Sequence, residues 1–71
     1  MTVSNLEVYE ARVAYLDAAI AEITAVCNVV EAPAEKQDEL RKIAQLAGDN
    51  AQQKFEAFTQ LADRRAAGHE D

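Results

Sequence analysis

The sequence predicts an all-α fold, in which two antiparallel helices form a hairpin that assembles into a multi-helix bundle. Three observations support it: a regular heptad of large apolar residues before Pro33, a second apolar stripe after it, and only two glycines and one proline in 71 residues. We expect helices over about residues 5–30 and 33–67, within a single domain that spans residues 1–71.

The first predicted helix carries the most regular pattern in the chain. Ser4 followed by Glu7 fits a capping box and places the helix start near Asn5. Eight apolar residues then recur at steps of 3-4-3-4-3-4-3, which is the seam of a left-handed helical pair. This apolar stripe consists of Leu6, Tyr9, Val13, Leu16, Ile20, Ile23, Cys27 and Val30. At this seam we expect Cys27 to be a small buried hydrophobe.

Pro33 marks the turn and the start of the second helix, and two arginines and a glycine mark its end. Proline suits the first position of a helix, where its missing N–H would have no partner. Arg64 and Arg65 suit a helix C-terminus, and Gly68 is expected to end the helix, with residues 68–71 as a frayed tail.

The second helix has a less regular apolar stripe, with a stutter beside Gly48. Its members are Leu40, Ile43, Ala47, Ala51, Phe55, Phe58 and Ala62. If Gly48 breaks the helix, Asp49 begins a third one and the fold is a three-helix bundle. One long helix is favoured, because Ala47 and Ala51 keep the stripe aligned across the glycine.

The composition predicts self-association. A core of this size seldom supplies more than about 3–5 kcal/mol without a disulfide, a metal or another chain. One cysteine and one histidine provide neither a disulfide nor a zinc site. The first helix also has more apolar surface than one neighbour can cover. We expect a homodimer or a higher oligomer, with a core made of the apolar stripe together with Leu40, Ile43, Phe55 and Phe58.

Several function classes are excluded by what the chain lacks. It has no phosphate-binding glycine loop, no metal motif and no catalytic triad, so we expect neither an enzyme nor a cofactor. The net charge of −6 disfavours duplex nucleic acid. No signal peptide and no apolar run near 18 residues is present, so we expect no membrane segment and a cytoplasmic location.

A row of polar residues beside the stripe is the candidate partner surface. Glu10, Asp17, Thr24 and Glu31 recur at seven-residue intervals. A solvated helix edge is the simpler interpretation, and an acidic docking strip is the functional one. Glu10, Asp17, Glu22 and an exposed Tyr15 are the candidate partner contacts. An acidic mimic of nucleic acid, which blocks a basic protein surface, is an alternative.

Residues 47–64, with Ala51-Gln52-Gln53-Lys54-Phe55-Glu56-Ala57-Phe58 at their centre, resemble the last helix of small phage sponges that sequester cyclic oligonucleotide signals (the anti-CBASS type). The resemblance implies a hairpin oligomer that binds anionic nucleotides between subunits. The chain has neither the family's tryptophan at the start of the second helix nor any lysine in the first. No residue roles are therefore transferred. The basic residues available for such a ligand are Arg12, Lys54, Arg64 and Arg65.

Together these features predict a small acidic, non-enzymatic interaction protein. We expect it to bind a partner protein as a helical oligomer, in the manner of an inhibitor, adaptor or regulator. A nucleotide sponge and a purely structural bundle component are the competing hypotheses.

Overall fold

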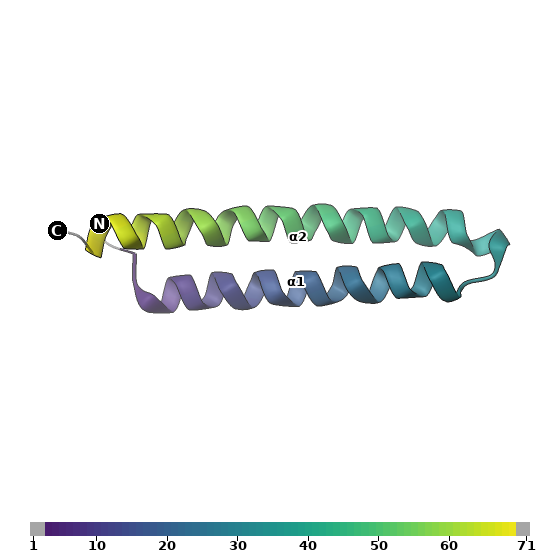
Figure 1. Cartoon of the computed structure of the whole chain (residues 1–71), viewed down its shortest axis with the longest axis horizontal. Coiled ribbons are helices and arrows are strands. Elements are labelled where there is room, and N and C mark those ends of the chain that lie inside the picture. The colour runs from purple at the N-terminus through teal and green to yellow at the C-terminus, as the bar shows by residue number, and fades with distance from the viewer. Residues whose placement is uncertain (1–2, 70–71) are drawn as a thin grey trace.

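Two antiparallel helices form a slender hairpin (Figure 1). The computed structural model describes residues 3–69, with side chains over residues 3–67. Helix α1 spans Asn5–Glu31 and helix α2 spans Ala34–His69. The molecule measures 57 × 14 × 13 Å. The predicted all-α hairpin with arms of unequal length is confirmed.

The helix ends follow from local sequence. Ser4 Oγ accepts a hydrogen bond from the backbone N–H of Glu7 at 3.2 Å, and the Glu7 carboxylate accepts one from the Ser4 N–H at 3.1 Å. The predicted capping box is therefore present. Helix α2 runs through Gly48 without a break, so the three-helix alternative is wrong. It also continues through Gly68 to His69, past the predicted terminator, while residues 70–71 of the expected tail lie outside the described part.

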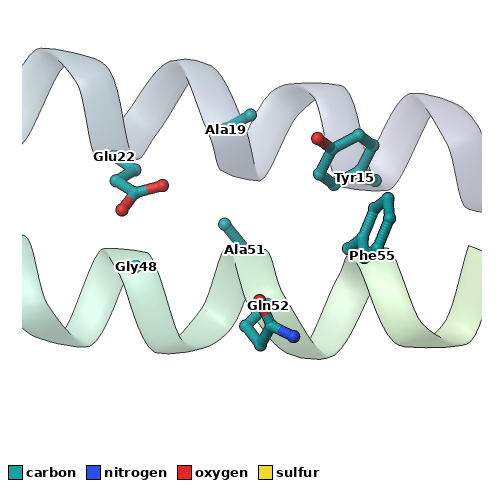
Figure 2. A pocket seen from close by; sticks show the side chains of 7 residues that line it. All are labelled: Tyr15, Ala19, Glu22, Gly48, Ala51, Gln52 and Phe55. Atoms are coloured by element: carbon teal, nitrogen blue, oxygen red, sulfur yellow. The ribbon is translucent and has the colours of Figure 1, made fainter.

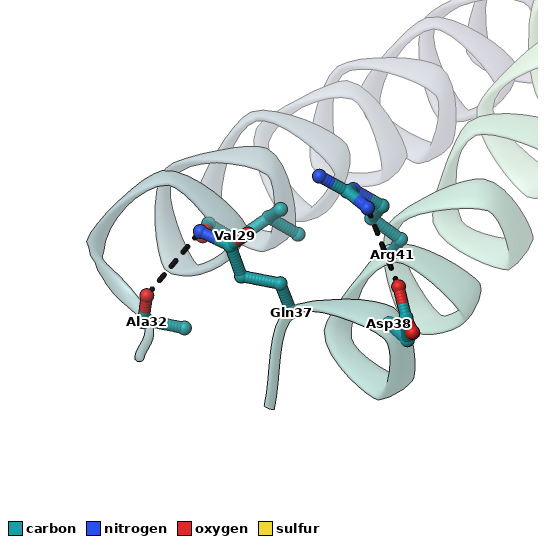
Figure 3. Close-up of polar contacts among 5 residues, drawn as sticks. All are labelled: Val29, Ala32, Gln37, Asp38 and Arg41. Carbon is teal, nitrogen blue, oxygen red and sulfur yellow. Dashed lines mark hydrogen bonds and ion pairs between the residues drawn. The ribbon is translucent and has the colours of Figure 1, made fainter. Parts of the chain in front are cut away.

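The turn is short and is held by one side chain. Only Ala32 and Pro33 separate the helices, and α2 begins one residue after the proline. The side-chain nitrogen Nε2 of Gln37 donates to the carbonyl oxygens of Val29 at 3.4 Å and Ala32 at 3.3 Å (Figure 3). Since the last carbonyls of a helix lack partners within it, Gln37 caps α1 from the first turns of α2.

The surface of α1 that packs on α2 is not the apolar stripe. It is a second heptad, displaced by two residues from the first, and it consists mostly of small residues. This inner seam contains Val8, Ala11, Tyr15, Ala18, Glu22, Ala25 and Val29, all buried or half-buried. The apolar stripe therefore does not join the two helices of the hairpin, and its role as the core of an oligomer stays a prediction. Small side chains let two helix backbones lie close together, and the alanines in the middle of α2 match them.

Helix α2 contributes a matching face with the expected stutter. Its inward residues are Gln37, Leu40, Ala44, Ala47, Ala51, Phe55, Phe58, Ala62 and Arg65, of which Phe55 stays 41% exposed. Ile43 was expected in this set, but it is exposed and Ala44 takes the inward position. The buried residues of the described chain are three alanines, Ala18, Ala25 and Ala51, and no large side chain is fully buried. The hairpin alone therefore has almost no hydrophobic core.

Candidate functional site

The most prominent feature of the surface is the apolar stripe, which lies on the face of α1 turned away from α2. The exposed fraction of its seven members other than Cys27 runs from 37% at Val13 to 75% at Val30. Cys27, predicted to be buried, is exposed together with them. Every member of the predicted seam is thus free to contact another molecule.

Two edges border this stripe, and they differ in charge. One is the acidic row, Glu10, Asp17, Thr24 and Glu31, and all four residues are exposed, as expected of a solvated edge. The other, which we call the opposite edge, is Asn5, Arg12, Ala19 and Val26. Helix α1 has five acids and one base, whereas α2 has six of each, so the net negative charge of the helices belongs to α1.

Helix α1 is apolar on most of its circumference, because two heptads of apolar residues occupy opposite faces. It has 27 residues, and by length and composition it could cross a membrane. The expectation that the chain has no such segment was too strict, since it counted only uninterrupted apolar runs. Helices that are apolar all round are otherwise found buried inside proteins, and few residues of α1 are buried in the hairpin.

Tyr15 does not belong to the exposed surface, contrary to the prediction. Its ring centroid lies 5.1 Å from that of Phe55, with the rings tilted by 58°, and 6.3 Å from that of Phe58 in a stacked orientation. Offset or tilted aromatic pairs stabilise a fold by about 0.5–1.5 kcal/mol beyond the stabilisation from the apolar area that they bury. Tyr15, Phe55 and Phe58 therefore hold the two helices of one chain together.

Glu22 also lies between the helices. Contrary to the prediction, it does not share a surface with Glu10 and Asp17. Its side chain points toward Gly48 across an open groove of about 320 Å³ (Figure 2). A Cβ atom on Gly48 would lie 2.8 Å from Glu22 Oε2, so the glycine makes room for this carboxylate. The groove is lined by Tyr15, Ala19, Glu22, Gly48, Ala51, Gln52 and Phe55.

The four basic residues considered for an anionic ligand do not line this groove. Arg65 Nη1 donates to the backbone oxygen of Val3 at 3.4 Å, which ties the end of α2 to the segment before α1. Arg12, Lys54 and Arg64 are exposed. A carboxylate, Glu22, is the charged group in the groove, which disfavours an anion there. Among the described residues, no group of three His, Cys, Asp or Glu side chains is placed to hold a metal.

The exposed surface of the chain is large for its mass. It amounts to 5536 Å², whereas a folded monomer of 7.8 kDa is expected to expose about 4,400 Å². The excess is about 1,100 Å². An average stable interface buries about 800 Å² on each partner. The unburied surface is therefore sufficient for one such interface.

Three features of the site were not predicted from the sequence: the inner seam, the close approach of Glu22 to Gly48, and the Gln37 cap. A signal for the inner seam exists, because Ala11, Ala18 and Ala25 recur at seven-residue intervals. Alanine is common on every face of a helix, so this repeat is hard to distinguish from ordinary helix composition.

Comparisons with protein-family models, with curated proteins and with solved structures find no match to the chain. The resemblance of residues 47–64 to the phage sponges stays an expectation from the sequence.

Proposed function

We propose that the chain is a small acidic, non-enzymatic interaction protein whose docking surface is the apolar stripe of α1. The observation that carries the proposal is that all eight members of a regular heptad face away from the hairpin's own second helix. An uninterrupted heptad of large apolar residues is the surface that a helix offers to another helix. Exposed apolar surface of this extent is typical of interaction sites.

The proposed mode of action is to hold a helical assembly together with the stripe and to present acidic side chains around it. Ten of the eleven acids in the described residues are exposed, and the eleventh is Glu22. In a role as inhibitor, adaptor or regulator, the partner protein would present a basic surface that complements them. Electrostatic complementarity of this kind raises the association rate and the specificity more than the affinity.

The test places a charge in the middle of the stripe. Ile20→Asp puts a carboxylate at a stripe position that is exposed in the hairpin, so association through the stripe is lost. Because the hairpin has almost no core of its own, its helix content is expected to fall with the association. Gln53→Asp introduces the same charge on an exposed position of α2 and serves as the matched control. Light-scattering mass and circular dichroism are measured for both. Loss of association in Ile20→Asp but not in Gln53→Asp supports the proposal, whether or not helix content falls with it.

Two other results contradict it. If Ile20→Asp associates as the wild type does, with itself and with any bound protein, the stripe is not the docking surface. If the wild-type chain co-sediments with phosphatidylcholine vesicles and gains no protein partner, the apolar face of α1 serves a bilayer instead.

A further inference from the structure

We infer that the occupant of the apolar stripe is a second copy of this chain, with the two α1 helices parallel and in register. This inference rests on the proposed function, since it names the partner of the same surface. The unburied area described above is enough for one stable interface, and the alanine core of a single hairpin leaves the large apolar residues to be buried elsewhere.

The centre of the stripe has the residues that are typical of a two-stranded coiled coil. Val13 and Ile20 alternate with Leu16 along the heptad. In parallel dimers, β-branched residues at one core position and leucine at the other favour two strands. When two stripes pair, each hairpin keeps its own α2 on the far side, so the assembly contains four helices with the α1 pair in the middle.

The charges beside the stripe select the parallel orientation. In a parallel pair, the acidic row of one helix lies along the opposite edge of the other, and the residues of these edges form the interhelical ion pairs. Arg12 precedes Asp17 by five residues, which is the spacing for contact between those edges in register. Each Arg12 guanidinium then lies beside the partner copy's Asp17, and symmetry makes two such pairs.

An antiparallel pair brings equal edges together instead. With the stripes aligned end to end, Leu6 lies opposite the partner copy's Val30, and the two acidic rows face each other. The two Asp17 carboxylates then approach one another, and Arg12 meets no acidic residue, so the pairing is repulsive. The helix dipoles do not compensate, because each α1 is already paired with its own antiparallel α2.

Cys27 reports the orientation directly. In the parallel dimer the two Cys27 side chains are opposite each other. In the antiparallel dimer Cys27 lies opposite Tyr9 of the partner copy, and the two cysteines are about 27 Å apart at 1.5 Å per residue. Only the parallel arrangement therefore allows a short bis-maleimide to link the native chains. The control is the same reaction in guanidinium chloride, where no specific link forms.

Charge reversal provides the second test, through the sign of its effect. In the parallel dimer Asp17→Arg places Arg12 beside an arginine, and the dissociation constant from sedimentation equilibrium rises roughly 3- to 10-fold. Arg12→Asp weakens the dimer in the same way, and an equimolar mixture of the two variants restores it, since opposite charges then meet at both sites. Asp63→Arg, an equal change on exposed α2, leaves the constant unchanged.

The expected result is a mass of two 7.8 kDa chains, a native Cys27 link and weaker association of Asp17→Arg. Tighter association of Asp17→Arg without a Cys27 link overturns the parallel arrangement. A mass of three or more chains overturns the dimer. A monomer whose stripe binds a foreign helix, with Ile20→Asp abolishing that binding, overturns this inference but leaves the proposed function intact. Association that Ile20→Asp does not change contradicts both.

Discussion

The side chain of Glu22 occupies the space that a methyl group on Gly48 would need. A Cβ atom there would lie 2.8 Å from Oε2 and 3.5 Å from Cδ of Glu22. A glycine inside a helix costs about 1 kcal/mol relative to alanine, and this contact gives a physical reason for its presence in the middle of α2. The carboxylate and the glycine also mark one register between the two helices.

Gly48→Ala is expected to raise the free energy of unfolding by about 0.5–1 kcal/mol at a fixed chain concentration. The atom in the way is the end of a flexible side chain beside an open groove, so Glu22 can move aside. In a Glu22→Ala background nothing opposes the new methyl group, and the gain is expected to be larger. Thermal or urea unfolding of the wild type, of the two single variants and of the double variant measures both effects. A loss of stability in Gly48→Ala alone means that Glu22 is held in place.

Ala18→Leu is expected to lower the free energy of unfolding by about 1–3 kcal/mol, because it overpacks the inner seam. Ala18 is 6% exposed. The matched control is Ala21→Leu, an equal change at an exposed position of the same helix, for which a change within about 0.5 kcal/mol is expected. Circular dichroism melts distinguish the two. Equal effects at both positions would show that α1 does not pack on α2 through its alanines.

Gln37→Ala is expected to lower the free energy of unfolding by about 0.5–1.5 kcal/mol, because the carbonyl oxygen of Ala32 loses its side-chain donor and that of Val29 keeps only the backbone N–H of Ala32. Gln53→Ala removes the same side chain from an exposed site on α2 and is the control. Hydrogen exchange at the end of α1 is a second measurement, since loss of the cap should speed exchange there first. Unchanged exchange and stability would mean that water replaces the amide without loss.

Much of the fold follows from local signals. The capping box of Ser4 and Glu7, the Pro33 turn and the lack of other helix breakers place both helices within one or two residues of their observed ends. These signals act within a turn or two of the chain, so they can be recognised without knowledge of the tertiary structure. The continuation of α2 through Gly68 was missed, because a glycine usually terminates a helix by adopting positive φ, and no described glycine does so.

The candidate site was only partly predictable. All eight residues of the stripe were identified as a seam, but Tyr15 and Glu22 were assigned to the outer surface and lie between the helices. Ile43 was assigned to the stripe of the second helix, but it is exposed in the hairpin, where Ala44 takes the inward position. Each of these errors depends on which face of a helix meets its neighbour, and periodicity along one helix does not state that.

The sequence by itself determined that α1 has a regular apolar heptad, that a second helix follows a short turn, and that a chain of this composition lacks a sufficient core. Only the tertiary structure decided which of the two heptads on α1 packs on α2. The physical reason is complementarity: the middle of α2 offers Ala44, Ala47 and Ala51, and close packing against them requires the small residues of α1, so the large ones are left facing outward.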